Sequence, residues 1–469
     1  MTFLKLSSLH EDNAFHKFWQ KNNVIIAFLL LLIIFSAYSI FLAFNLESGF
    51  IPDEGYRFEV SQYFATTWGI PEDVPITATT GEDLFRNPFM GYWIFGRAIN
   101  VISLVNPAAS ERQVLVALRI LNSLFALGTA WVTYLISKEV IKNKWLQLLP
   151  VFMLTNTLMF VFLSGGVSYD NPANFFCTLG IYFFIRVLKD KAFLTNSLAW
   201  MVCVAFGALI KHTVLPLAAV MFISWLVYAL VEKVRLSIEN TSNKPVFYFL
   251  ALLLIVIVGL NFYLYGINLV NYHSLKPNCY DTFPAEVCDE SVFVVRHREI
   301  GLPEKLTVGE AFKQGYPDPI RFTFDIWIRE MLKRIFGIMG GAGDYFPINI
   351  TYFHIALYWI ILLAFRYVRK PTYIVKALLS IFAFYCIVLI YTNYDTELAY
   401  GFYKYVALQG RYLFPVISIG FVLVTYAIEQ VKNRFVQLST VIALVVLFLY
   451  SGPIRFIWYH DSIFENWFV

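Results

Sequence analysis

Two acidic residues stand side by side, Asp53 and Glu54, in the segment SGFIPDEGYRFEVSQYFATTW that starts at Ser48. They follow a long apolar run that ends at Asn45, so they lie just beyond a segment able to cross a membrane. One acid at the start of the next helix could serve as an N-terminal cap that satisfies free backbone N–H groups. Two adjacent acids point in different directions, so one can contact a reacting group while the other binds a cation or backbone. The pair therefore predicts a catalytic function, with capping as the alternative.

A third acid, Asp170, lies in the stretch LSGGVSYDNPANFF between two apolar runs. Asn171-Pro172 is typical of a first helical turn, so a helix cap is again the alternative. Two separated acids that converge on one cavity suit a base and the group that orients it. We therefore expect Asp53, Glu54 and Asp170 to form the catalytic set, and the sequence leaves open whether Asp53 or Asp170 is the base.

Three basic residues lie in or beside apolar sequence: Arg119 in LVALRILN, Lys211 in LIKHTVLPL and Arg411 in ALQGRYLFPV. Ionisable residues at membrane depth are expensive and usually functional, with a partner nearby. Arginine suits phosphate because its fork donates two parallel hydrogen bonds. We expect all three to bind a phosphate, although Lys211 could equally snorkel to the membrane surface and Arg119 could pair with one of the acids.

Acids suit deprotonation of a nucleophile, and cations suit a phosphate leaving group. Together they predict transfer of a sugar from a polyprenyl-phosphate donor. The neighbouring candidates for substrate binding are Tyr56, Arg57, Gln409 and Tyr412. Two alternatives use similar residues: a transporter or flippase of lipid-linked saccharide, and a polymerase or ligase that joins lipid-linked sugars.

The composition places these residues in a membrane protein. Of the 469 residues, 59% are hydrophobic and 14% are charged, whereas a soluble protein has about 25% charged residues. The apolar runs predict an all-α polytopic protein with about eleven transmembrane helices. The predicted spans are 23–45, 115–137, 146–164, 172–188, 196–211, 213–231, 247–268, 351–367, 373–393, 411–430 and 435–451. The apolar stretch 88–105 contains Arg97 and two asparagines, so we expect it at the membrane interface.

Clusters of Lys and Arg set the orientation. They follow alternate spans, as at Lys138, Lys142 and Lys144, so the N terminus is expected inside and the C terminus outside. The segments 47–114 and 269–350 are then outside, with every candidate site residue on that face. This predicts a multi-pass protein of the bacterial inner (plasma) membrane with an extracytoplasmic site. The basic residues are scattered, so no nucleic-acid partner is expected.

The large outer segment 269–350 contains one amphipathic helix, RFTFDIWIREMLKRIFG, with Phe324, Trp327 and Met331 on one face. We interpret it as a helix lying flat on the membrane, with a lid over a site as the alternative. Cys279 and Cys288 lie nine residues apart in the same segment and predict a disulfide.

Several motifs, taken in order, resemble those of the GT-C superfamily of integral membrane glycosyltransferases, which includes protein O-mannosyltransferases and the aminoarabinose transferases that modify lipid A. They are the PDE of Pro52–Glu54, RNPFMGYW from Arg86, RILNSLFALGTAWVTYLISKEV from Arg119, the Tyr169-Asp170 turn and Leu209–Lys211. The QGRYLFP box at Gln409–Pro415 is more similar to a large uncharacterised bacterial branch.

The resemblance implies a conserved module over 1–268, whose first outer loop 47–114 folds into helices over the cavity, followed by the outer loop 269–350 and C-terminal helices in 351–469. It implies an inverting transfer with Asp53 as base and with Lys211 and Arg411 on the donor phosphate. The expected partners are a polyprenyl-phosphate sugar, an envelope acceptor and membrane lipids. The resemblance allows a divalent cation, but the residues do not indicate one because the acids are few. Arg86-Asn87-Pro88 replaces a Lys-Pro-Pro-like segment, and no large C-terminal domain is recognised, so the acceptor stays open.

Overall fold

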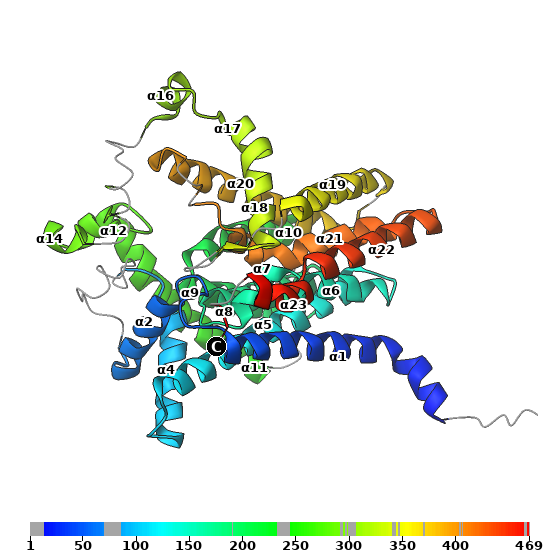
Figure 1. Ribbon diagram of the computed structural model, residues 1–469, viewed down its shortest axis with the longest axis horizontal. Coiled ribbons are helices and arrows are strands. Elements are labelled where there is room, and N and C mark those ends of the chain that lie inside the picture. The colour runs from blue at the N-terminus through cyan, green and yellow to red at the C-terminus, as the bar shows by residue number, and fades with distance from the viewer. Residues whose placement is uncertain are drawn as a thin grey trace, which may run out of the picture.

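The architecture comes from a computed structural model and is a bundle of long helices with shorter helices at one end (Figure 1). The structure describes residues 14–69, 86–189, 191–231, 244–290, 294–295, 298, 306–339, 344–345, 348–368, 371–402, 405, 407–463 and 467–468.

The longer helices of the bundle are α1 (Ala14–Asn45), α5 (Glu111–Val140), α8 (Asp170–Leu188), α9 (Phe193–Ile210), α10 (Leu215–Val231), α11 (Lys244–Asn261), α19 (Ile348–Ala364), α20 (Tyr373–Ala399), α21 (Phe414–Glu429) and α22 (Arg434–Ser451). The shorter ones are α2 (Glu54–Thr66), α4 (Met90–Val105), η1 (Leu146–Leu148), α6 (Leu149–Thr155), α7 (Leu158–Ser164), η2 (His212–Val214), η4 (Phe262–Gly266), α12 (Ile267–Tyr272), α13 (Cys279–Thr282), α14 (Ala285–Cys288), α16 (Val308–Lys313), α17 (Pro319–Arg321), η5 (Phe322–Trp327), α18 (Ile328–Ile335), η6 (Phe365–Tyr367), η7 (Gly410–Leu413) and α23 (Pro453–Ile463). Two antiparallel strands of two residues each, β1 (Ile338–Met339) and β2 (Asp344–Tyr345), complete the described elements.

The prediction of an all-helical polytopic protein is confirmed. Within the described ranges, eight helices are long and apolar enough to cross a membrane, or nine if the pair α6–α7, bent by 63°, forms one broken span. All eleven predicted spans fall on helices. The span 351–367 falls on a shorter apolar helix, α19, and the span 172–188 falls on α8, which is not among the eight. The number eleven therefore stays a prediction.

The described residues between α1 and α5 include α2 and α4, which lie side by side (Figure 1). Gly96 lets the two helices touch, because a Cβ atom there would lie 2.7 Å from the backbone carbon of Phe64. Arg97, on α4, donates to the carbonyls of Phe64 and Thr67 at the end of α2. Arg97, because of which 88–105 was not predicted to cross the membrane, therefore joins α4 to α2.

Helix α8 lies in the middle of the bundle, where it packs on α5, α9 and α21. Small residues permit close approach. At Gly128 of α5, the ring of Phe175 from α8 fills the space that a side chain would take. Hydroxyl groups also join the helices, since Thr133 Oγ1 and Ser418 Oγ lie 2.8 Å apart. The first contact joins α5 to α8, which begins at Asp170, and the second joins α5 to α21.

The amphipathic helix forms as α17, η5 and α18, but its apolar face contacts protein. Trp327 and Met331 are buried, and Trp327 Nε1 donates to Asn393 Oδ1 of α20 at 2.9 Å. Phe324, expected on the same face, is 58% exposed, because the π-helical turn of η5 shifts the register before α18. The interpretation of a helix whose apolar face lies on the membrane is therefore corrected.

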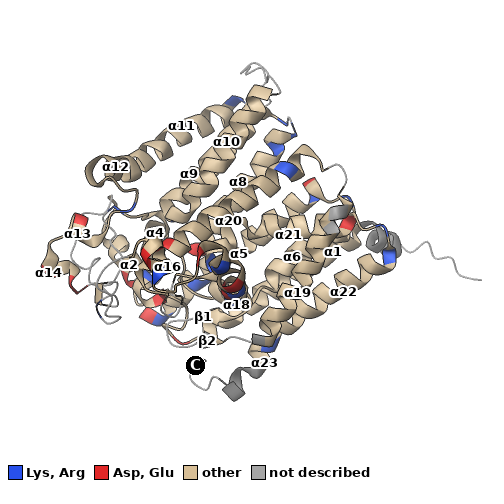
Figure 2. Ribbon diagram, turned by 90° about the horizontal axis from the view of Figure 1, so that it is seen from above, with Lys and Arg blue, Asp and Glu red and all other residues tan. Residues whose placement is uncertain are grey.

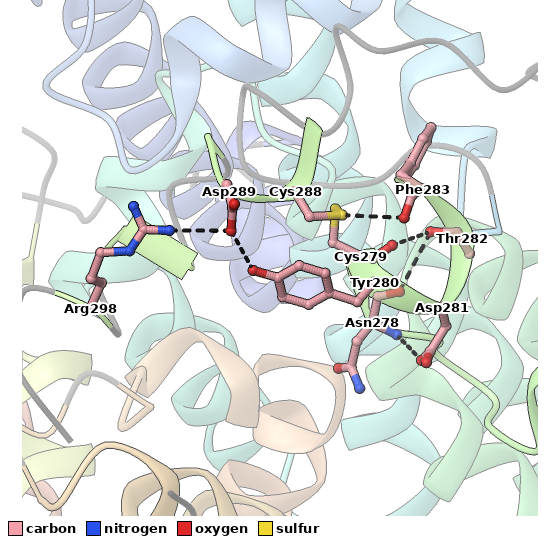
Figure 3. The surroundings of a disulfide bond; sticks show 9 residues. All are labelled: Asn278, Cys279, Tyr280, Asp281, Thr282, Phe283, Cys288, Asp289 and Arg298. Atoms are coloured by element: carbon pink, nitrogen blue, oxygen red, sulfur yellow. Dashed lines mark hydrogen bonds and ion pairs between the residues drawn. A yellow bond between two sulfur atoms is a disulfide. The ribbon is translucent and has the colours of Figure 1, made fainter. Parts of the chain in front are cut away.

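The predicted disulfide between Cys279 and Cys288 is present, and the two Cα atoms lie 5.7 Å apart. It joins the short helices α13 and α14 (Figure 3). Beside it, the hydroxyl of Tyr280 donates to Asp289 Oδ1 at 2.8 Å. The bond therefore closes a small local unit that follows α12.

Candidate active site

Asp53 occupies the residue before α2 with a left-handed backbone, φ 60°. Its carboxylate makes no capping hydrogen bond to that helix. Instead, Asp53 Oδ2 accepts from Arg411 Nη2 at 2.8 Å and from Arg57 Nη2 at 3.1 Å. The side chain is 53% exposed, so it is accessible from outside the bundle. The alternative of a simple helix cap is therefore not what the side chain does.

Two opposing effects act on the pKa of Asp53. Partial burial raises it, but the positive charges of Arg411 and Arg57 lower it more, and the result is a pKa of about 2. Asp53 is thus an ionised carboxylate at neutral pH, held by two guanidinium groups.

Asp170, the first residue of α8, is completely buried. Its Oδ1 pairs with Lys211 Nζ, and its Oδ2 accepts from Ser168 Oγ at 3.1 Å. The same Oδ2 lies 3.8 Å from Arg57 Nη1 and 3.6 Å from Arg411 Nη1. The structure therefore brings Asp53 and Asp170 to the same two arginines, although α2, α8 and η7 are far apart in the sequence.

The site cluster, defined as Asp53, Arg57, Asp170, Lys211 and Arg411, contains three cations and two carboxylates. All except Asp53 are at least 90% buried. With every group ionised, the cluster has a net charge of +1. Arg57 Nε, Arg411 Nε and Arg411 Nη1 have no hydrogen-bond partner among the described residues. Buried cationic donors without a partner are costly, so this arrangement favours a bound anion.

Aromatic rings line the cluster. The guanidinium carbon of Arg57 lies 4.2 Å from the ring centroid of Tyr169, and Lys211 Nζ lies 4.8 Å from that of Tyr412. Both distances are within the range of cation–π attraction. Tyr92 packs edge-on against Tyr169 with centroids 5.6 Å apart, and Tyr56 packs on Tyr92 in turn.

Glu54 and Arg119 lie elsewhere, in a separate buried pair. Arg119 Nε donates to Glu54 Oε1 at 2.8 Å, and Arg119 Nη2 donates to Oε2 at 2.6 Å. The remaining donors of Arg119 bind the carbonyls of Ala43, Leu46 and Glu47, so all five N–H groups are engaged. Arg119 therefore pairs with Glu54, as the alternative left open by the sequence has it, and has no N–H group left over for a phosphate.

Glu54 also reaches the turn before α8. Its Oε1 accepts from the backbone N–H of Val167 at 2.9 Å. Glu54 thus joins the start of α2 to Arg119 of α5 and to the turn that carries Ser168 and Asp170, and Arg119 in turn binds carbonyls at the end of α1. We expected this acid in the catalytic set, and the structure places it among buried structural contacts.

Of the candidate substrate-binding residues, Arg57 belongs to the site cluster and Tyr412 contacts it through Lys211. Tyr56 packs on Tyr92, which in turn packs on Tyr169. Gln409 precedes η7, where its carbonyl accepts from Tyr412 N at 3.0 Å. The sequence reasoning missed Ser168, which accepts from Arg57 Nη1 at 2.8 Å. Its only sequence signal is its position two residues before Asp170, as in a side-chain-to-backbone turn.

The comparisons with known proteins agree with this fold. Residues 84–274 match the sequence model of the dolichyl-phosphate-mannose-protein mannosyltransferase family. The matched range includes Asp170 and Lys211, whereas Asp53 and Arg411 lie outside it. No curated protein sequence matches the chain significantly.

Two solved structures are similar in fold. The archaeal oligosaccharyltransferase AglB from Archaeoglobus fulgidus, in complex with an inhibitory peptide and a dolichol-phosphate, superposes with a TM-score of 0.50 and 12% identity, over 94% of this chain and 56% of AglB. ArnT from Cupriavidus metallidurans, bound to undecaprenyl phosphate, gives 0.47 and 13% over 89% of this chain and 62% of ArnT. The chain thus spans little more than half the length of AglB. The expected likeness to the GT-C superfamily is confirmed by the family match and the AglB fold.

Proposed function

We propose that this chain is an integral membrane glycosyltransferase that moves a sugar from a polyprenyl-phosphate donor to an extracytoplasmic acceptor. The acceptor would be a cell-envelope lipid, glycan or protein. The matched family model is named for a dolichyl-phosphate-mannose donor, and the AglB structure contains a dolichol-phosphate. Both names point to a lipid phosphate as the group this site would hold.

The observation behind the proposal is the charge of the site cluster. Its three cations exceed its two carboxylates by one, and three guanidinium nitrogen atoms lack a hydrogen-bond partner in the described structure. A phosphate would neutralise the excess and accept from these donors. Lys211 would add a point charge beside the same oxygen atoms. Arg119 has no part in this step, because Glu54 and three carbonyls already engage its donors.

The reaction needs a nucleophile, a base and a stabilised leaving group. A hydroxyl or amine of the acceptor attacks the anomeric carbon, and the bond between that carbon and the phosphate oxygen breaks, with inversion. The lipid phosphate leaves with the bonding electrons, and Arg411, Arg57 and Lys211 stabilise its charge. The base takes the proton from the attacking atom and contributes about 10² to 10⁴ in rate.

Asp53 fits the base better than Asp170. It is 53% exposed, whereas Asp170 is completely buried behind Lys211 and Ser168. A carboxylate with a pKa of about 2 is a weak base, however, because Arg411 and Arg57 hold it. We infer that donor phosphate draws Arg411 away from Asp53, which raises the pKa of Asp53 and frees its oxygen atoms. The base would then become effective only after the donor binds.

The proposal also includes the side of the membrane. Asp170 begins α8, and Lys189 follows the last residue of that helix. A helix of 19 residues is about 28 Å long, so these residues lie on opposite sides of a bilayer core. Figure 2 shows charged segments around α2, α16 and α18 at one end of the bundle, and further Lys and Arg along the opposite end. Because cytoplasmic loops carry the excess of Lys and Arg, we propose that the site cluster lies on the extracytoplasmic face of the inner membrane of a bacterium.

No metal is included in the proposed reaction. In the described part of the chain, no three His, Cys, Asp or Glu side chains gather into a metal-binding group. Asp53 Oδ2 and Asp170 Oδ2 both face Arg57 and Arg411, so the guanidinium groups lie where a cation shared by the two acids would lie. This donor set does not fit a divalent cation.

The test is a transfer assay with purified protein. Radiolabelled polyprenyl-phosphate sugars and an extract of envelope acceptors would be given to the wild type, to Asp53→Asn and to Glu59→Gln. Glu59 is an exposed acid on α2 and serves as the matched control. We expect transfer by the wild type and the control, and a loss of at least 100-fold in Asp53→Asn.

Other outcomes would change the proposal. Equal transfer by Asp53→Asn would overturn Asp53 as the base and make Asp170 the next candidate. If the wild type transferred no sugar from any donor but moved labelled lipid across liposomes, the transporter alternative would replace the enzyme.

A further inference from the structure

The placement of Arg411 depends on the residues that precede it after α20, of which 400–402, 405 and 407–410 are described and are called the segment before Arg411. Three described residues in or near its first half have a left-handed backbone: Gly401 at φ 57°, Phe402 at 58° and Tyr405 at 50°. The described residues 400–402, 405 and 407–409 belong to no helix or strand, so their position must come from contacts with other elements.

Arg334, near the end of α18, makes the main contacts. Its guanidinium is buried, and Nη1 donates both to the carbonyl of Tyr405, at 2.5 Å, and to the carbonyl of Leu408. Glu330, one helical turn earlier, lies 3.9 Å from the same guanidinium. The side chain of Arg334 therefore binds the segment at two carbonyls, those of Tyr405 and Leu408, which lie six and three residues before Arg411.

The backbone of α18 also touches the segment. A Cβ atom at Gly410 would lie 2.6 Å from the backbone carbon of Arg334 and 2.7 Å from its oxygen. Only glycine fits this approach, and Arg411 follows immediately. Arg334 thus contacts the chain around Arg411 with both its side chain and its backbone.

Helix α20 holds the middle of the segment. Glu397 Oε1 accepts from Ala407 N at 2.7 Å, and Asn393 Nδ2 donates to Ala407 O at 3.0 Å. Asn393 is in turn bound by Trp327 of η5. The continuous helix formed by η5 and α18 therefore supports the segment directly through Arg334 and indirectly through Trp327.

We propose that Arg334 is a positioning residue for the reaction: it holds Tyr405 and Leu408–Gly410 so that Arg411 reaches Asp53, Asp170 and the donor phosphate. This inference rests on the proposed function for the role of Arg411. Arg334 itself need not touch the substrate, because the side chain binds two backbone carbonyls.

The experiment measures affinity for undecaprenyl phosphate in nanodiscs. The variants are Arg334→Ala, Arg334→Lys, Arg411→Ala and the double variant Arg334→Ala/Arg411→Ala. Arg321→Ala is the matched control, because Arg321 lies earlier on the same outer helix, is 69% exposed and makes one weak ion pair with Asp325.

We expect Arg334→Ala to weaken binding about tenfold and Arg334→Lys to restore part of it, since an ammonium can still donate to a carbonyl. In the Arg411→Ala background, removal of Arg334 should have no further effect, because Arg334 acts through Arg411. An equal tenfold loss in both backgrounds, or no loss in the wild-type background, would overturn the proposal.

Hydrogen exchange of peptides covering 405–412 separates this inference from the proposed function. In Arg334→Ala we expect these amides to exchange at least tenfold faster, with α5 unchanged. If the wild type did not bind the lipid phosphate, the proposed function would fail, and this exchange would still decide whether Arg334 holds the segment. Unchanged exchange would overturn the inference whatever the lipid result.

Discussion

The adjacent acids Asp53 and Glu54 should give opposite phenotypes when each is replaced by its amide. Glu54 is buried and binds Arg119 through two hydrogen bonds and Val167 through a third. Asp53 is 53% exposed and faces the site cluster. We expect Glu54→Gln to destabilise the fold, and Asp53→Asn to keep the fold and lose transfer.

The two magnitudes follow from burial. Glu54→Gln leaves the buried charge of Arg119 without its counter-ion, and breaking a buried pair in this way costs about 3–5 kcal/mol. The ion pairs of Asp53 are partly in water, so their loss costs about 1 kcal/mol or less. The expected difference between the two variants is therefore about 2–5 kcal/mol in the free energy of unfolding.

The assay is SDS-induced unfolding of the purified protein in mixed micelles, followed by tryptophan fluorescence, with transfer measured on the same samples. A variant with both Glu54→Gln and Arg119→Met removes the uncompensated charge and should regain part of the lost stability. Recovery is expected to be incomplete, because Arg119 also binds the carbonyls of Ala43, Leu46 and Glu47.

One result would refute this reasoning. If Glu54→Gln unfolded like the wild type but transferred sugar at least 100-fold more slowly, Glu54 would act in the chemistry, as first expected from the sequence. The role of Asp53 as base would be contradicted if Asp53→Asn were destabilised but its folded fraction transferred sugar at the normal rate.

Three further predictions concern pH, the contact between Gly410 and Arg334, and the disulfide. The pKa of Asp53 is lowered to about 2 in the folded protein, below the usual value of about 3.9. Its ion pairs therefore contribute stability above pH 4 that is lost as pH falls toward 2, and the unfolding midpoints of wild type and Asp53→Asn should converge between those values. Gly410→Ala should weaken binding of undecaprenyl phosphate about tenfold, because the new Cβ would press on the backbone of Arg334; equal affinity would show that the backbone can give way. Replacing Cys279 and Cys288 by serine should speed hydrogen exchange only within residues 278–289 and leave lipid binding unchanged. A loss of binding would connect that unit to the site.

The sequence by itself determined the class of protein, and it predicted the side of the membrane on which its charges lie. Long apolar runs must become helices in lipid, because backbone groups there have no other partners. Loops that alternate in basic charge predict which ends face outward, and Asp53, Asp170, Lys211 and Arg411 all fall at such ends. For the same reason, the acids and cations of the site cluster could be named before any contact was known.

The amphipathic pattern of residues 321–337 was also sufficient to predict a helix, but not what would cover its apolar face. A membrane surface and a protein surface remove the same apolar groups from water, so periodicity cannot distinguish them. The structure packs Trp327 and Met331 on protein, and this contact brings Arg334 to the segment before Arg411.

Only the tertiary structure decided which acid pairs with which cation. Arg411 meets Asp53 across 358 residues of sequence, and Arg119 meets Glu54 across 65. Asp53 and Glu54 are neighbours of the same chemical type, yet one faces the site cluster and the other is buried among structural contacts. Composition and spacing cannot separate them, because the left-handed backbone at Asp53 and the packing of α1, α5 and α8 set the two directions. Local sequence gives the charge of a side chain, whereas the packing of distant helices gives its partner.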